Sequence, residues 1–180
     1  MNKKTAVIYQ SHYGATKRYA EWIAEELGAE LTERKDARSS LLSKYGLVIY
    51  GGGLYAGGIL GADLIAKNPC ESLVLFTVGL TDPAVTDYSP ILNRSFPQGL
   101  PRGAKVFHLR GGIDYGKLGL LHKGAMVMMK KMTIGKKTKA ELPTEERVFA
   151  DTYGGKVDFT DKASIYPLTE YVRGLGERTL

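Results

Sequence analysis

Short apolar runs that alternate with stretches of helical periodicity are the feature that most constrains the fold of this chain. Each run is rich in β-branched or aromatic residues, as buried strands are. The runs cover residues 5–10, 29–32, 47–50, 73–78 and 105–109. Because the longer runs are continuously apolar rather than alternating, both faces of their sheet should be covered. The pattern therefore predicts an α/β domain with a five-stranded parallel sheet and helices on both faces.

Helical periodicity fills the stretches between these runs. Ala20, Ile23, Ala24 and Leu27 predict a helix that begins near Ala15 and is ended by Gly28. Further helices are predicted at residues 60–67, 117–132 and 167–175, with Thr160 or Asp161 as caps before the last one. The length of 180 residues suits one domain, spanning residues 1–180.

The loop after the first predicted strand has the composition of an anion-binding turn. It leads directly into a helix, whose free backbone N–H groups and dipole favour a negative charge. Ser11 and Thr16 add hydroxyl groups, and Gly14 lets the backbone approach closely. The loop lacks a nucleotide-triphosphate motif, so it suits a single phosphate monoester. The alternative is purely structural, with Ser11 as a helix cap and Gly14 as a turn residue.

These residues carry a resemblance to a known family. The sequence Ser11-His12-Tyr13-Gly14-Ala15-Thr16 resembles the FMN phosphate loop of flavodoxins. Residues 49–57, 109–115 and 152–161 are similar to the flavodoxin-domain proteins that include the bacterial menaquinone-dependent protoporphyrinogen oxidase. The Gly-Gly-x-Asp-Tyr segment is the more specific sign, because ordinary flavodoxins lack it. The resemblance spans nearly the whole chain and implies a flavodoxin-like three-layer fold that holds one FMN non-covalently.

The resemblance also implies which residues contact the flavin. The phosphate loop contributes Ser11, His12, Tyr13, Gly14, Ala15 and Thr16; the later loops contribute Gly52, Gly53, Leu54, Tyr55, Thr77, Val78, Gly79, Leu80, Gly112, Asp114 and Tyr115. In flavodoxins a peptide of the loop after the third strand contacts the flavin N5 edge and changes orientation with redox state, which glycines would permit. The alternatives are a plain glycine-rich turn at that loop and, for Asp114, a cap on the following helix. Arg110 is expected to meet an acidic substrate or a phosphate, or to be solvated.

A competing motif overlaps the same glycines. Gly51-x-Gly53-x-x-Ala56 matches the dinucleotide-binding fingerprint. It follows the third predicted strand, and the next strand ends at Gly79 without the acidic residue that the fingerprint requires, Asp82 being the nearest. We therefore expect FMN rather than a dinucleotide.

The basic charge of the chain is concentrated in one segment. Between Tyr115 and Ala140 there is no Asp or Glu, and the segment holds seven lysines: Lys117, Lys123, Lys130, Lys131, Lys136, Lys137 and Lys139. Because the whole chain carries +6, the remainder sums to −1. The simplest interpretation is a helix with a solvated lysine face. The alternative is an interaction surface for an acidic redox partner or, through Lys117 to Lys139, for an anionic membrane. No nucleic acid is expected, because no nucleic-acid motif or interleaved aromatic residues accompany the lysines.

The expected function is that of an FMN-dependent oxidoreductase that passes electrons between a reduced substrate and a quinone-type acceptor. Two alternatives stay open: a non-enzymatic electron carrier, and a flavodoxin-fold module that binds a partner without a cofactor. No metal site is expected, since His12, His108 and His122 lack ligand spacing. The single cysteine, Cys70, fits a reducing cytosol, and no apolar run approaches the roughly 20 residues that span a bilayer. We therefore expect a cytoplasmic protein, with peripheral contact at the inner face of the membrane as an option.

Overall fold

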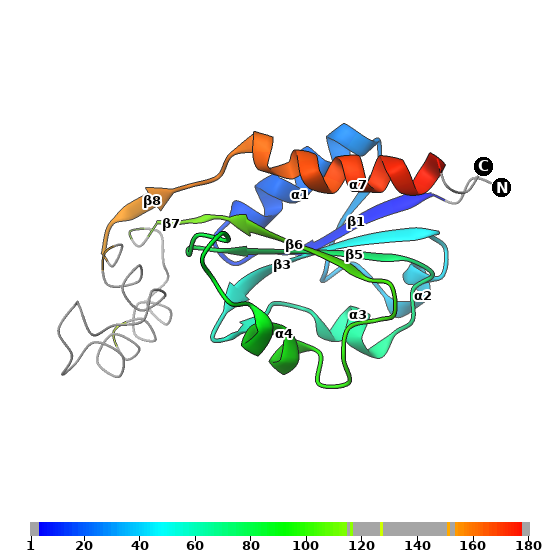
Figure 1. Cartoon of the computed structure of the whole chain (residues 1–180), viewed down its shortest axis with the longest axis horizontal. Helices are drawn as coiled ribbons and strands as arrows, with labels where there is room; N and C mark the ends of the chain where they lie inside the picture. The colour runs from blue at the N-terminus through cyan, green and yellow to red at the C-terminus, as the bar shows by residue number, and fades with distance from the viewer. Residues whose placement is uncertain (1–3, 115, 117–126, 128–150, 152–153, 178–180) are drawn as a thin grey trace.

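A parallel sheet of five strands forms the middle layer of the molecule (Figure 1). The computed structural model of the chain describes residues 4–114, 116, 127, 151 and 154–177. The strands are β1 (Thr5–Gln10), β2 (Glu30–Glu33), β3 (Leu47–Tyr55), β5 (Leu73–Gly79) and β6 (Lys105–Arg110). Their order is β2-β1-β3-β5-β6, so the winding of the chain reverses between β1 and β3. This order confirms the predicted flavodoxin-like α/β fold. Ligands of such sheets bind beyond the carboxyl ends of the strands, near that reversal.

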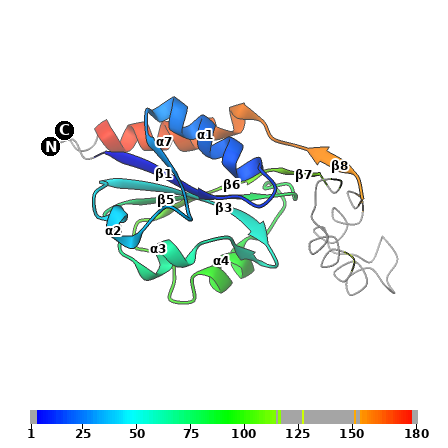
Figure 2. The same cartoon turned by 180° about the vertical axis from the view of Figure 1, so that it is seen from behind.

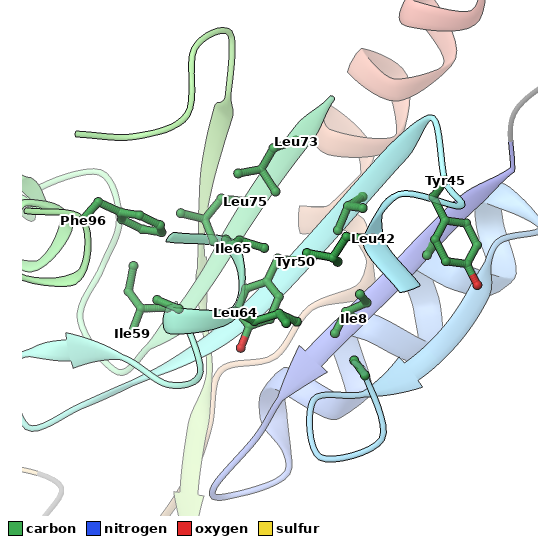
Figure 3. Packing of buried hydrophobic residues seen from close by; sticks show 14 residues of the cluster. Ile8, Leu42, Tyr45, Tyr50, Ile59, Leu64, Ile65, Leu73, Leu75 and Phe96 are labelled. Carbon is green, nitrogen blue, oxygen red and sulfur yellow. The ribbon is translucent and has the colours of Figure 1, made fainter. Parts of the chain in front are cut away.

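Helices cover both faces of the sheet, as predicted. One face carries α1 (Ala15–Leu27) and α7 (Tyr166–Glu177), and the other carries α2 (Ser39–Leu42), α3 (Asp63–Lys67) and α4 (Ser89–Ser95) (Figures 1 and 2). Because successive strand side chains point to opposite faces, β1 contributes to both cores. Val7 lies in the core under α1 and α7, whereas Ile8 lies in the core on the opposite face. Figure 3 shows this second core, in which Tyr50 packs close to Leu64.

Helix α1 forms where the periodicity predicts it. Tyr19, Ala20, Ile23 and Ala24 are buried on one side of the helix. Gly28 ends it in the left-handed conformation (φ 59°), and its N–H reaches back to the carbonyl of the last turn. The helix therefore presents its N-terminus, and the loop before it, to the carboxyl edge of the sheet.

Strand β3 is longer than predicted, because the three glycines after Tyr50 belong to the strand and not to a loop. Gly51 pairs with Phe76, and Gly53 pairs with Val78, in register with β5. A Cβ at Gly51 would lie 2.1 Å from Phe76 Cζ. Glycine is thus required at Gly51 because a side chain of the neighbouring strand fills the space of a Cβ. Since the three glycines lie within a strand, they do not form the turn that the dinucleotide-binding fingerprint requires.

The chain leaves β3 through a tight hairpin that the sequence did not predict. The short strand β4 (Gly58–Ile59) pairs antiparallel with the end of β3. The two residues between them, Ala56 (φ 48°) and Gly57 (φ 74°), both have positive φ, as a type I′ turn requires. Helix α3 consequently begins at Asp63 and not at residue 60, although it ends at Lys67 as predicted.

A second, two-stranded sheet extends beyond the end of the main sheet (Figures 1 and 2). It pairs β7 (Gly112–Asp114) with β8 (Lys156–Asp158), neither of which was predicted as a strand. After β8 a 3₁₀ helix (Lys162–Ile165) leads into α7, and the Asp161 side chain accepts a hydrogen bond from the Ala163 N–H, as the predicted cap. Apart from residue 127, the helix predicted at residues 117–132 lies outside the described residues.

The other element bounds differ from the prediction in detail. The second strand begins and ends one residue later than predicted, and the last helix begins at Tyr166. Helices α2 and α4 were not predicted, because neither has more than two turns over which an apolar period could be detected.

Candidate functional site

The loop after β1 folds into a compact turn at the N-terminus of α1. The Gly14 N–H donates to Ser11 Oγ at 3.0 Å, and the Arg18 N–H donates to the Gly14 carbonyl at 3.1 Å. Gly14 has a φ of 92°, and a Cβ at this position would meet nothing within 4 Å. Gly14 is therefore a turn residue, as in the alternative interpretation, but it is also the N-cap of α1; Ser11 is not the helix cap and instead closes the turn before the helix. The first turn of α1 nevertheless offers the positive end of the helix dipole to an anion.

The phosphate-loop candidate and the β3–β4 hairpin lie against each other. The ring centroids of His12 and Tyr55 are 5.0 Å apart, and those of His12 and Tyr13 are 4.8 Å apart. Buried Thr16 places its Oγ1 3.1 Å from the position that a Cβ of Gly53 would occupy. The structure thus brings together predicted residues from the first and third loops, at the reversal point between β1 and β3.

The end of β5 continues this group of residues. Gly79 lies against the side chain of Leu54, since a Cβ at Gly79 would be 2.8 Å from Leu54 Cδ1. The Gly79 carbonyl accepts a hydrogen bond of 2.6 Å from the Gly111 N–H. The backbone of Gly79 and Leu80 therefore lies beside the end of β3, next to the hairpin.

The side chains of Thr77 and Val78 are not available to a ligand. Both residues are buried, and the Thr77 hydroxyl is 2.6 Å from His108 Nδ1. His108 stacks on Tyr88 with a centroid distance of 3.6 Å, and burial lowers the pKa of His108 to about 4. At neutral pH the imidazole is therefore uncharged and serves packing and hydrogen bonding.

Of the flavin contacts predicted after β6, the described ones do not lie together with the phosphate loop. Gly111 lies beside the phosphate loop, because a Cβ at Gly111 would be 3.2 Å from Ala15 Cβ. Gly112 and Asp114 belong to strand β7, which extends away from the main sheet (Figure 1). The Asp114 carboxylate accepts a hydrogen bond of 3.0 Å from the Gly116 N–H, so it stabilises a turn. Tyr115 lies outside the described residues.

A polar network joins α1 to the segment after β8, and sequence reasoning missed it. Arg18 donates to Asp158 Oδ2 at 2.7 Å and to Thr160 Oγ1 at 2.6 Å. The Tyr19 hydroxyl donates to the Arg110 carbonyl at 2.7 Å and accepts from the Asp161 N–H at 3.1 Å. Arg18 and Asp158 are 140 residues apart in sequence, so no local pattern could have indicated the pair.

A small cavity of about 260 Å³ lies beside the carboxyl end of β6. Its lining includes Tyr19, Asp82, His108, Arg110 and Phe159. The volume is below the roughly 300–1,000 Å³ of typical ligand pockets, and none of the predicted flavin-contact residues lines it. The cavity is therefore distinct from the group formed by the first, third and fourth loops.

The sequence matches a family model described as the flavodoxin domain, over residues 6–140. No curated protein sequence matches the chain.

Several solved structures are also similar. The WrbA-like flavodoxin protein of Agrobacterium tumefaciens is 21% identical, with 59% of this chain and 83% of that chain covered and a TM-score of 0.41. Flavodoxin 2 of Bacillus cereus, in its oxidised form, is 18% identical, with 59% and 85% covered and a TM-score of 0.43. A flavoprotein of Lactobacillus acidophilus NCFM, solved in complex with FMN, is 20% identical, with 60% and 92% covered and a TM-score of 0.39.

Proposed function

Because the chain belongs to the flavodoxin-domain family, we propose that it binds FMN non-covalently and uses the flavin for electron transfer. The observation that carries this proposal is the contact between the loop before α1 and the β3–β4 hairpin, where His12 meets Tyr55. The two elements meet at the reversal point of the strand order, which is where doubly wound sheets bind their ligands.

The residues present fit the chemical groups of FMN. The loop from Ser11 to Thr16 suits the phosphate, since Gly14 leaves open space and the first turn of α1 has free N–H groups. The hairpin with Tyr55 suits a flat ring by aromatic contact, and the backbone at Gly79 and Leu80 suits the edge of that ring by hydrogen bonds. When bound, the flavin would supply the one- or two-electron chemistry, and the chain would bind and orient it.

We place the protein among the quinone-linked oxidoreductases of the protoporphyrinogen oxidase type. Two of the stretches that resemble that subfamily, around residues 111–114 and 157–161, are neighbours in space. Gly112 pairs with Asp158, and Ile113 pairs with Val157. Because the two stretches form one small sheet, we infer that they act together in the proposed oxidoreductase.

The proposed partners are a redox protein or a quinone-type acceptor, approached through the lysine-rich segment from Lys117 to Lys139. Apart from residue 127, this segment lies outside the described residues, so the support for its role is its sequence. In the part of the chain that the structure describes, no helix is both long enough and apolar enough to cross a membrane. A cytoplasmic location with peripheral membrane contact belongs to the same proposal.

Absorbance spectroscopy tests the cofactor directly. The purified protein should show a flavin spectrum or bind added FMN, and protein that neither carries nor binds FMN would contradict the proposal. Turnover of a quinone or of protoporphyrinogen by the loaded protein separates the enzyme from a pure electron carrier, which would be reduced reversibly without turnover.

Paired substitutions test the phosphate loop. The double variant Ser11→Ala/Thr16→Ala should bind FMN about tenfold more weakly or worse, because two hydroxyl groups are lost, while riboflavin affinity changes little. The matched control is Ser43→Ala, since the Ser43 hydroxyl only bonds the Ser40 carbonyl at the end of α2. Equal weakening of FMN and riboflavin would show that the loop does not hold the phosphate.

A further inference from the structure

The loop after β5 is held in place by Arg110, the last residue of β6. Arg110 Nε donates a hydrogen bond of 3.0 Å to the Leu80 carbonyl. Because the donor is charged, this bond is stronger than a neutral one and fixes the direction in which the carbonyl points. That direction is toward β6, on one side of β5.

The orientation of the Leu80 carbonyl determines the orientation of the next N–H. The Leu80–Thr81 peptide is planar and trans, so the Thr81 N–H points opposite to the Leu80 carbonyl. In the sheet, β3 and β6 lie on opposite sides of β5. The Thr81 N–H therefore points away from Arg110 and from the end of β6.

Thr81 is a buried residue with an unused backbone donor. Its exposed fraction is 9%. Among the described residues, none accepts a hydrogen bond from the Thr81 N–H. A backbone N–H in such a position normally finds an acceptor, because leaving it unsatisfied costs free energy. A carbonyl oxygen or nitrogen at the edge of a ligand ring would satisfy it.

Arg110 is itself positioned by the segment after β8. Its guanidinium carbon lies 3.7 Å from the centroid of the Phe159 ring, in cation–π contact. The Phe159 N–H donates to the Gly111 carbonyl at 3.1 Å, which holds this segment against the end of β6. A chain of contacts thus runs from the segment after β8, through Arg110, to the peptide of Leu80 and Thr81.

We propose that Arg110, set by Phe159, is a positioning residue that aims the Thr81 N–H at the edge of the flavin ring. This inference rests on the proposed function, because it assumes that a flavin binds beside the carboxyl ends of β3 and β5. It assigns to Arg110 a role different from the recognition of an acidic substrate. It also means that the segment after β8 influences the proposed cofactor site through Arg110.

Substitutions at both residues test the proposal. Arg110→Ala should weaken FMN binding about tenfold, the loss typical of a charge-assisted hydrogen bond. Arg110→Lys should restore little of the lost FMN affinity. The lysine ammonium lacks the planar guanidinium, which stacks flat on Phe159 and at the same time donates to the Leu80 carbonyl through Nε. Phe159→Leu should weaken binding about threefold in the wild-type background and have no further effect in the Arg110→Ala background. The midpoint potential of the bound flavin should shift in all three single variants, because the donor at the ring edge is misdirected.

The control is Arg173→Ala, which removes an arginine that bonds Glu26 between α7 and α1. It should leave both FMN affinity and the midpoint potential unchanged. Wild-type affinity and potential in Arg110→Ala, or an equal effect of Phe159→Leu in both backgrounds, would overturn the proposal.

A measurement without cofactor separates this inference from the proposed function. In the cofactor-free protein, the amide ¹⁵N shift of Thr81 should change in Arg110→Ala and Phe159→Leu but not in Arg173→Ala. If the wild-type protein fails to bind FMN, the proposed function fails, and the Thr81 shift still reports whether Arg110 orients the peptide. An unchanged Thr81 shift in Arg110→Ala would overturn the positioning role even in a protein that binds FMN.

Discussion

Glycines in β3 are required because neighbouring side chains occupy the space of a Cβ. The Phe76 ring fills this space at Gly51, and a Cβ at Gly52 would be 2.2 Å from Ile59 Cγ2. Both glycines also form ladder pairs with β1 and β5, so their peptides cannot turn over without breaking the middle of the sheet. If a peptide reorients with redox state, the Ala56–Gly57 turn is the place for it, because its positive φ angles already store strain at Ala56.

Replacement of Gly51 by alanine should therefore destabilise the protein by about 1–3 kcal/mol, the usual cost of overpacking a core. Gly174→Ala is the matched control: nothing lies within 4 Å of its Cβ position inside α7, so it should stabilise by about 0.5–1 kcal/mol. Urea denaturation of both variants measures the difference. The double variant Gly51→Ala/Phe76→Leu should recover part of the loss, and a neutral Gly51→Ala would contradict the packing argument.

At the scale of elements, the described strands and helices divide into those with a local pattern and those without one. The main strands and α1 could be predicted, because their apolar periodicity lies within one segment. The β3–β4 hairpin and the β7–β8 sheet could not, since Gly51 imitates a turn signal and Gly112 pairs with a residue 46 positions away. The same holds for the candidate site. The loops after β1, β3 and β5 could be predicted from local sequence, but the contacts of Arg18 and Phe159 could not, because their partners are distant in the sequence.

The contact between α1 and β8 predicts a specific dependence on pH. The hydrogen bond from Arg18, and then that from Thr160, lower the pKa of Asp158 from 3.8 to about 2. A carboxylate with a depressed pKa stabilises the fold fully above about pH 4, and this contribution is lost as the pH falls toward 2. Its size should be modest, because the Asp158 side chain is 43% exposed. The free energy of unfolding should thus fall more steeply from pH 4 to pH 2 in the wild type than in Asp158→Asn.

Hydrogen exchange locates this effect in the structure. At pH 6 the β7–β8 amides should exchange faster in Asp158→Asn than in the wild type, with the amides of β1 and β3 unchanged. Arg18→Ala should reduce the same part of the pH dependence, because Arg18 is the main cause of the shifted pKa. Identical pH profiles in the wild type and in Asp158→Asn would refute the role of this contact.

At the scale of the whole molecule, the two ends of the sheet have different roles. The carboxyl ends of β1, β3 and β5 lie at the same end as the β7–β8 sheet, and the start of β1 and the end of α7 lie at the opposite end (Figures 1 and 2). Asp114 and Lys156 are paired, so the chain between them departs from and returns to the end that carries the candidate cofactor site. All seven lysines between Tyr115 and Ala140 belong to this segment of the sequence, while the rest of the chain sums to −1.

From the proposed role of this segment we expect its charge to govern association but not cofactor binding. The triple variant Lys123→Gln/Lys130→Gln/Lys131→Gln should bind FMN like the wild type and associate more weakly with vesicles containing phosphatidylserine, by about 1 kcal/mol per lysine. The matched control is Lys44→Gln/Lys67→Gln/Lys105→Gln, which removes the same charge from the turn before β3, the last residue of α3 and the first residue of β6. Vesicle sedimentation at low salt measures both. Both variants change the net charge equally, so a long-range attraction would weaken the vesicle association of both alike. A local docking surface in the lysine-rich segment would weaken the association of the first variant only. Equal effects, or no effect, would show that these lysines form only a solvated face.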